Sequence, residues 1–363
     1  GNGGFAQASV ELTITQVRDP VMVRAPYIQS LATSSVTIRW KTDEETDTVV
    51  RYGTVEGTLD QSASDPVAGQ DHTVTLNGLV SNTTYYYSVG DNVAAIGSSP
   101  DYHVTTHADS ATASATRLWF LGDTGTSPSA ATSVRDAYIT FNGDSHADTL
   151  ILLGNNTTAP ADEGSYQSAL FDLLATTLGN SPAWPTPGTN EGADTATYFN
   201  LHTLPTDGVS GGQASGTEAY YSFDHANIHV VSLDTTTTDL SPGGAMATWL
   251  NTDLSNNIQE WVIVFFHHPP YSKGLHDSDS PGSTLESVRT NILPILESNG
   301  ADLVVSAHSH SYERSVLLDG HYGDSTTYNA GTMAVDAGAG DPGAGDGYVK
   351  EPVANAGAVY AVV

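Results

Sequence analysis

The first residues with a regular hydrophobic pattern are residues 8–15. Ala8, Val10, Leu12 and Ile14 fall on one face of an extended segment, and the residues between them are polar. Side chains of a strand alternate between its two faces, so this pattern predicts a half-buried β-strand. We expect residues 1–19 to form an N-terminal arm that carries this free strand.

A series of short strands follows between residues 20 and 106. The runs SVTIRW, TVVRYGT and TTYYYSVG are rich in β-branched and aromatic residues, and turn residues separate them. Trp40 and the Tyr85–Tyr87 run supply the large side chains that the core of a sandwich needs. We therefore predict an all-β sandwich over residues 20–106, followed by a linker of small polar residues at 107–116.

The pattern changes at residue 117, where apolar strands begin to alternate with helical segments. Strands are predicted at 117–122 and 149–154, and apolar residues at helical spacing follow each of them, at 128–141 and 163–178. The later runs WVIVFF and LVVS are apolar throughout, which is typical of strands covered on both faces. Residues 117–363 are therefore predicted to form a layered α/β domain, which makes the chain a two-domain protein of mixed α+β and α/β type.

The net charge of the chain limits the kinds of molecule that it is expected to bind. Its formal net charge is −30, because 41 acidic residues face only three lysines and eight arginines. Such a surface repels nucleic acid and anionic membranes, so neither is an expected partner. No apolar run approaches the roughly 20 residues that span a bilayer. The neutral-polar, acidic composition is typical of secreted or cell-surface proteins, and the absence of cysteine excludes disulfides.

Polar side chains follow four of the apolar strands directly. They are Asp123, Asn155, the pair His267 and His268, and the pair His308 and His310. Ligands of open α/β sheets bind beyond the carboxyl ends of the strands, so we expect these residues to lie at one site. Carboxylate and imidazole groups together suit iron, manganese or zinc.

The segments FLGDTG, VFFHHPPYS and SAHSHSYER occur in the order found in metallophosphoesterases. The N-terminal sandwich resembles a fibronectin type III domain, and with it the chain resembles the purple acid phosphatases. The resemblance implies a metallophosphoesterase-like α/β domain with two metal ions, whose bridging hydroxide attacks a phosphate ester. By position, Asp123 and His310 would hold the first metal, and His267 and His308 would hold the second.

Two motifs depart from that family. Its second motif has a bridging Asp and a Tyr ligand, where this chain has Asn155 and Thr158. Its third motif has an Asn ligand and a substrate-side His, where this chain has Thr189 and Asn190. Asn155, Thr189 and Asn190 are therefore only weak candidate ligands, and we assign no catalytic residue. A shift of one residue would let Asn190 take the place of the missing Asn ligand.

The missing bridging carboxylate affects how many metal ions the site can hold. Two dications at about 3.5–4 Å repel each other, and an amide at the bridging position supplies no charge to compensate. The resemblance therefore leaves open whether the chain binds one or two ions of iron, manganese or zinc, or none. Three other polar residues are predicted to be structural, with His229 packed between strands, Asp234 capping a turn and Arg314 outside the site.

Three functions follow from these observations. The preferred one is a pseudoenzyme with a structural or binding role, one form of which would be a filament subunit assembled by N-terminal strand addition. The alternatives are an active metal-dependent phosphoesterase, acting as acid phosphatase or phosphodiesterase, and a module that binds a single metal, a carbohydrate or an anion. Residues 8–17 either insert into a neighbouring subunit or add an edge strand to their own sandwich. In resembling proteins further strands follow the segment matched by TMAVDAGAGD (332–341), whereas this sequence stops soon after it, at 356–363, which predicts an unpaired sheet edge.

Overall fold

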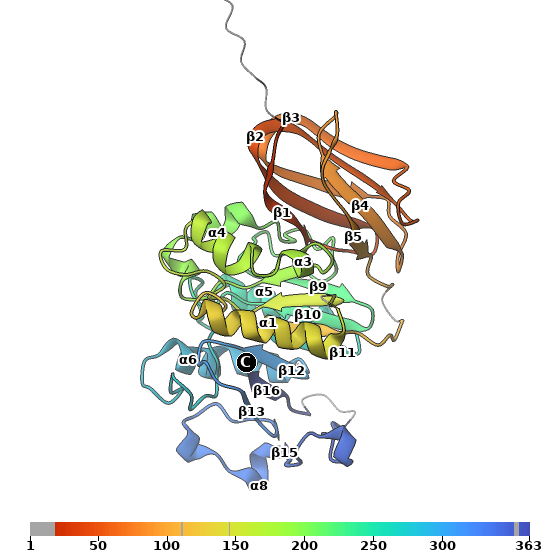
Figure 1. The fold of residues 1–363 in the computed structure, drawn as a ribbon. Helices are drawn as coiled ribbons and strands as arrows, with labels where there is room; N and C mark the ends of the chain where they lie inside the picture. The colour runs from red at the N-terminus through yellow and green to blue at the C-terminus, as the bar shows by residue number, and fades with distance from the viewer. Residues whose placement is uncertain (1–18, 110–111, 145, 352–355) are drawn as a thin grey trace, which may run out of the picture.

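The computed structural model describes residues 19–109, 112–144, 146–351 and 356–363. These residues form an N-terminal β-domain and a larger α/β domain, which pack against each other (Figure 1). The segment 8–17, with the predicted N-terminal strand, lies outside the described residues.

In the described part of the chain, no helix has both the length and the apolar character needed to cross a membrane.

The N-terminal domain is a β-sandwich, as predicted. The long strand β2 pairs with β3 along most of its length, while its first half pairs with β1 and its second half with β4. This arrangement encloses a core that contains Trp40, Val50 and Tyr87, each at most 2 % exposed. The strands are β1 (Met22–Gln29), β2 (Ser35–Gly53), β3 (Gln61–Asn77), β4 (Thr84–Gly90) and β5 (Ala95–Thr105).

The second domain contains two main sheets. A parallel sheet has the strand order β6-β7-β8, and a six-stranded sheet has the order β13-β16-β12-β11-β10-β9. Strands β9 and β10 of this sheet form a hairpin, because they follow each other in the chain and pair antiparallel. Strand bounds are β6 (Leu118–Leu121), β7 (Thr149–Leu152), β8 (Ala183–Pro185), β9 (Tyr221–His225), β10 (Ile228–Ser232), β11 (Trp261–Phe265), β12 (Leu303–Ser306), β13 (Glu313–Arg314) and β16 (Val359–Val362), with a small pair β14 (Leu317–Leu318) and β15 (Ala334–Asp336).

Helices lie outside these sheets. The α-helices are α1 (Pro128–Asn142), α2 (Glu163–Tyr166), α3 (Ala175–Leu178), α4 (Thr195–Leu201), α5 (Ala245–Asn256), α6 (Thr284–Ser287), α7 (Leu293–Ser298) and α8 (Ala330–Met333). The predicted helix at 163–178 is divided, because a π-helical turn at Gln167–Phe171 separates α2 from α3. A second π-helical turn, Val288–Ile292, joins α6 to α7, and short 3-10 turns occur at Glu191–Ala193, Ser325–Thr327 and Pro342–Ala344.

Successive side chains of a buried strand point to opposite faces of the sheet, so they belong to two different hydrophobic cores. Val230 and Val305 belong to the core between the two sheets, which also contains Leu150 and Ile151. Their neighbours on the strands, such as Val231, belong to a second core with helices α5 and α7. The six-stranded sheet is therefore covered on both faces, as the apolar runs WVIVFF and LVVS predict.

The C-terminal strand β16 lies inside the six-stranded sheet. It pairs with β12 in parallel and with β13 in antiparallel fashion, so both of its edges are paired. The unpaired edge that the sequence predicts is therefore not an edge of this strand.

Candidate metal centre

The polar residues predicted to meet lie at the carboxyl ends of β6, β7, β11 and β12. Asp123, Asn155, His308 and His310 all have left-handed backbone conformations, with φ between 50° and 67°. Such conformations are rare for residues with a side chain and tend to occur at functional sites, where the surrounding structure holds them. Three strands, β6, β7 and β12, thus end in tight, strained turns that direct polar groups to one place.

Both oxygens of the Asp123 carboxylate accept hydrogen bonds from the protein. The Asn155 Nδ2 donates to Oδ1 at 2.8 Å, and the backbone N–H of His308 donates to Oδ2 at 2.8 Å. His310 lies farther away, with Nε2 at 3.6 Å from Oδ1. Burial raises the pKa of Asp123, and the bonds from Asn155 and His308 oppose that effect. The carboxylate is satisfied by N–H groups alone.

The Asn155 amide is held in one orientation. Its Oδ1 accepts from the backbone N–H of Asn190 at 2.8 Å, which leaves Nδ2 to face Asp123. The buried carboxylate of Glu191 accepts from the backbone N–H groups of Asn155 and Asn156, each at 2.8 Å, and from that of Gly188 at 2.9 Å. Glu191 thus ties the second and third motifs together, a role that its place in the sequence does not reveal.

The third motif does not bring its side chains to Asp123. Asn190 donates through Nδ2 to the carbonyl oxygen of Thr157 at 2.8 Å, and Thr189 is exposed. Asn190 therefore contributes a backbone N–H to Asn155 while its side-chain donor points to the second motif.

Three histidine side chains form a compact group beside Asp123. One nitrogen of each of His267, His268 and His308 lies within 4.8 Å of the others. The Nδ1 of His267 donates to the Leu153 carbonyl oxygen at 2.8 Å, so its Nε2 is the accepting nitrogen, 3.1 Å from Nδ1 of His308. His268 was not assigned a role from the sequence, although its position next to His267 in the HHPP run was the available signal.

The electrostatics of this group favour neutral imidazoles. Burial, together with repulsion from neighbouring histidines, lowers the pKa of His267 to about 3, that of His268 to about 2 and that of His308 to about 4. The Nδ1 of His268 lies 2.9 Å from the Thr235 hydroxyl, which holds the ring in place. Neutral imidazoles held by second partners are the form in which histidine binds metal.

The residues present do not fit a dinuclear centre. The Asn155 amide presents N–H groups where a bridging carboxylate would present oxygens, and Asp123 has donors on both oxygens. The three histidines, by contrast, match the ligand number and type of a single site for zinc or a similar cation. His310, 40 % exposed, is not one of these three, and its Nε2 lies 3.6 Å from Oδ1 of Asp123.

The residues predicted to be structural lie apart from this site. His229 bonds to Asp224 at 2.7 Å and to Asp253 at 2.9 Å, and Asp234 accepts from the backbone N–H groups of the turn that follows it. Arg314 donates to the carbonyl oxygens of Ala339 and Gly340. These contacts confirm a structural role for all three.

Comparison with known proteins agrees with this architecture. The family described as purple acid phosphatase, N-terminal domain, matches residues 23–106, and the calcineurin-like phosphoesterase family matches residues 116–312. Purple acid phosphatase 18 of Arabidopsis thaliana is 27% identical over 301 residues, which cover 77% of this chain and 63% of that protein. The chain thus spans less than two thirds of the length of this relative.

Solved structures show the same fold. The purple acid phosphatase PPD1 from yellow lupin aligns with a TM-score of 0.64 at 18% identity, over 95% of this chain and 64% of that one. The structure of PhoD aligns with a TM-score of 0.58 at 12% identity, over 84% of this chain and 75% of that one. The calcineurin-like phosphoesterase match covers more than half of the chain and follows a matching N-terminal domain. The chain therefore belongs to the calcineurin-like phosphoesterases and is a purple-acid-phosphatase-like member of that family.

Proposed function

We propose that this protein is a pseudoenzyme of the purple acid phosphatase type, which has lost the dinuclear hydrolysis of phosphate esters. One observation carries the proposal, the 2.8 Å hydrogen bond from the Asn155 amide to Asp123. A carboxylate at residue 155 would face the Asp123 carboxylate, and the pair would need a cation or a shared proton between them. The amide supplies an N–H instead, so the site is satisfied without two cations.

Metal content and turnover test this proposal together. We expect the purified protein, offered iron, manganese and zinc, to bind fewer than two ions per chain and to hydrolyse no phosphate monoester or diester. The combined variant Asn155→Asp, Thr189→Asn, Asn190→His should gain a second ion. Two ions per chain in the unaltered protein, with turnover that Asp123→Ala abolishes, would instead establish an active phosphoesterase.

A second candidate function is the binding of a single metal ion by His267, His268 and His308. The observation in its favour is the group of three neutral imidazoles with nitrogens within 4.8 Å, two of them held by Leu153 and Thr235. Such a site would hold zinc in a three-histidine set with a free coordination position, where the ion would act as a Lewis acid. It differs from the inherited arrangement because it uses His268 and omits His310.

In place of hydrolysis, we propose a structural role for this protein, which we propose is secreted or displayed at the cell surface. The alternating pattern of residues 8–15 supports self-association by strand addition, and a contact of this kind between unlike surfaces builds open filaments. Deletion of residues 1–17 tests it by sedimentation velocity. An unchanged distribution of assembled species in the truncated protein would eliminate self-association through the arm.

A further inference from the structure

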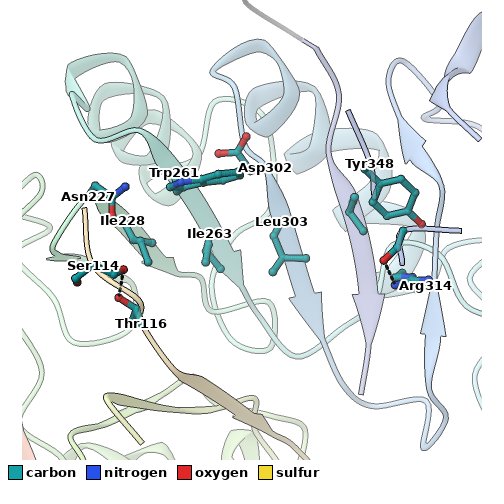
Figure 2. A pocket seen from close by; sticks show the side chains of 12 residues that line it. Ser114, Thr116, Asn227, Ile228, Trp261, Ile263, Asp302, Leu303, Arg314 and Tyr348 are labelled. Atoms are coloured by element: carbon teal, nitrogen blue, oxygen red, sulfur yellow. Dashed lines mark hydrogen bonds between the residues drawn. The ribbon is translucent and has the colours of Figure 1, made fainter. Parts of the chain in front are cut away.

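An apolar groove of about 530 Å³ lies at the amino ends of the parallel strands of the six-stranded sheet, the opposite end from the histidines. Figure 2 shows Ile228, Ile263 and Leu303 in a row across neighbouring strands, with Trp261 beside them. Trp261 is 49% exposed, which is unusual for so large an apolar side chain at the start of a central strand. The groove therefore leaves the amino ends of these strands less covered than their middles, which are buried.

The groove continues the core between the two sheets. Side chains two apart on a strand share a face, so Ile228 stands beside Val230, and Leu303 beside Val305. Val230 and Val305 belong to the core between the sheets, against which Ile228 and Leu303 are only partly buried. Among the described residues, the core between the sheets thus buries Val230 and Val305 fully. It covers Ile228 and Leu303, two residues nearer the amino ends of the same strands, only in part.

The strand that borders the groove has a free edge. β6 pairs only with β7 among the described strands, and Thr116, two residues before β6, lines the groove. The carbonyl oxygens of Arg117 and Leu121 accept from the β7 side, so the backbone groups of Leu118 and Phe120 point to the other edge. An unpaired edge beside partly buried apolar side chains and the exposed Trp261 is a template for one more strand.

We infer that residues 8–17 of a second copy of this chain add to the free edge of β6 and cover the groove. This inference rests on the self-association part of the proposed function and identifies its receiving surface. Eight extended residues span about 26 Å, twice the length of a four-residue strand such as β6. Val10, Leu12 and Ile14 would face Ile263 and Leu303, and the polar residues between them would face away from the core.

The arm of the same chain is too short to reach this groove. β1 starts at the end of the sandwich remote from β12 and β16 (Figure 1), and its contacts with the second domain, from Arg24 to Glu163 of α2 and from Ile28 to Pro182 before β8, are not with the groove. β1 alone is about 26 Å long, whereas the five residues from Ile14 to Asp19 span at most about 18 Å. The occupant therefore comes from another copy, and the contact is head to tail.

Disulfide trapping tests the inference cleanly, because the chain has no cysteine of its own. One variant carries Leu12→Cys and a second carries Leu303→Cys, and the two are mixed and oxidised mildly. We expect a cross-linked heterodimer, identified by peptide mass spectrometry. The matched control is Val134→Cys on α1, a half-exposed apolar position outside the groove, which should give no heterodimer. Trp261→Cys serves as a second acceptor at the rim of the groove, should Leu303→Cys fold poorly.

The results distinguish an error in the receiving surface from an error in the proposed self-association. If neither acceptor cross-links while deletion of residues 1–17 abolishes assembly, the arm binds elsewhere and only the receiving surface is wrong. If the deletion leaves assembly unchanged, both are wrong. A disulfide within one chain of the Leu12→Cys, Leu303→Cys double variant would also overturn the inference, because the arm would then fill its own groove.

Discussion

At residue 155, an amide and a carboxylate differ by an N–H group and a negative charge. That difference decides whether the neighbouring Asp123 has a donor or a repelling partner at 2.8 Å. The second motif is held in place, because Glu191 and Asn190 hold Asn155 through the backbone and the side-chain oxygen. The chemistry of the site therefore depends on whether residue 155 is an amide or a carboxylate.

The first prediction concerns this bond. Asn155→Asp should lower the free energy of unfolding by about 1–3 kcal/mol in chelator, because a buried donor is replaced by a second carboxylate. Zinc or manganese should restore part of that loss in the variant. Thermal unfolding with and without metal measures both effects, and Asn256→Asp on the exposed end of α5 should change stability by less than about 0.5 kcal/mol. A variant as stable as the parent in chelator would show that the bond contributes little.

The second prediction distinguishes two arrangements of metal ligands. If the three histidines hold one ion, His268→Ala should weaken zinc binding at least about tenfold, because one of three ligands is lost. His310→Ala should leave it nearly unchanged, since His310 lies outside the group. Competition with a chromophoric chelator measures both affinities. The reverse order of effects would support the inherited arrangement of Asp123 and His310.

Sequence reasoning located these residues but did not determine their contacts. The candidates that directly follow apolar strands could be placed at the carboxyl ends of those strands from the pattern alone. The orientation of the Asn155 amide depends on Asn190 and Asp123, which lie 35 and 32 residues away, and no local pattern encodes it. His268 was passed over because the family resemblance directed attention to His267.

At the scale of elements, one buried histidine connects two strands and a helix. His229 on β10 lies between Asp224 on β9 and Asp253 on α5, at 2.7 and 2.9 Å. Burial opposes its positive charge, but the bonds to the two carboxylates raise the pKa of His229 to about 9. The hairpin and the helix that covers it are therefore linked through a charged group.

The third prediction is a pH dependence of stability. The folded pKa of about 9 exceeds the unfolded value of about 6.5. The stabilisation is therefore complete below pH about 6.5 and is lost as the pH rises toward 9. Urea unfolding at several pH values should show this decline, with an upper limit of roughly 3 kcal/mol, and His229→Gln should flatten it. An equal decline in the variant would assign the effect to other groups.

The order of elements was predictable, while their grouping into sheets was not. The strands, the hairpin of β9 and β10 and the outer helices follow from apolar runs and their period. The division into a three-stranded and a six-stranded sheet depends on pairings between distant segments, such as β12 with β16. The sequence predicted an unpaired edge near the C-terminal segment, but the edge bordering the groove belongs to β6.

At the scale of the whole molecule, the two domains form a continuous body. Tyr27 of β1 donates to the Leu201 carbonyl oxygen at 2.8 Å, and Arg39 donates to that of Asn200 at 2.6 Å. The described chain begins at Asp19, next to β1 of the sandwich, whereas the residues that line the groove belong to the other domain. A contact between the segment before Asp19 of one copy and the groove of the next would join unlike surfaces, as a repeating head-to-tail assembly requires.

The fourth prediction concerns salt. Each copy has a net charge of −30, so neighbouring copies repel one another, while the groove that receives the arm is largely apolar. Raising the ionic strength shortens the Debye length from about 30 Å at 0.01 M to about 10 Å at 0.1 M, which screens the repulsion and leaves the apolar contact intact. Assembly should therefore strengthen as sodium chloride increases, as light scattering at fixed protein concentration would show. Dissociation at high salt would instead mean that ion pairs hold the copies together, in conflict with a contact built on Leu12 and Leu303.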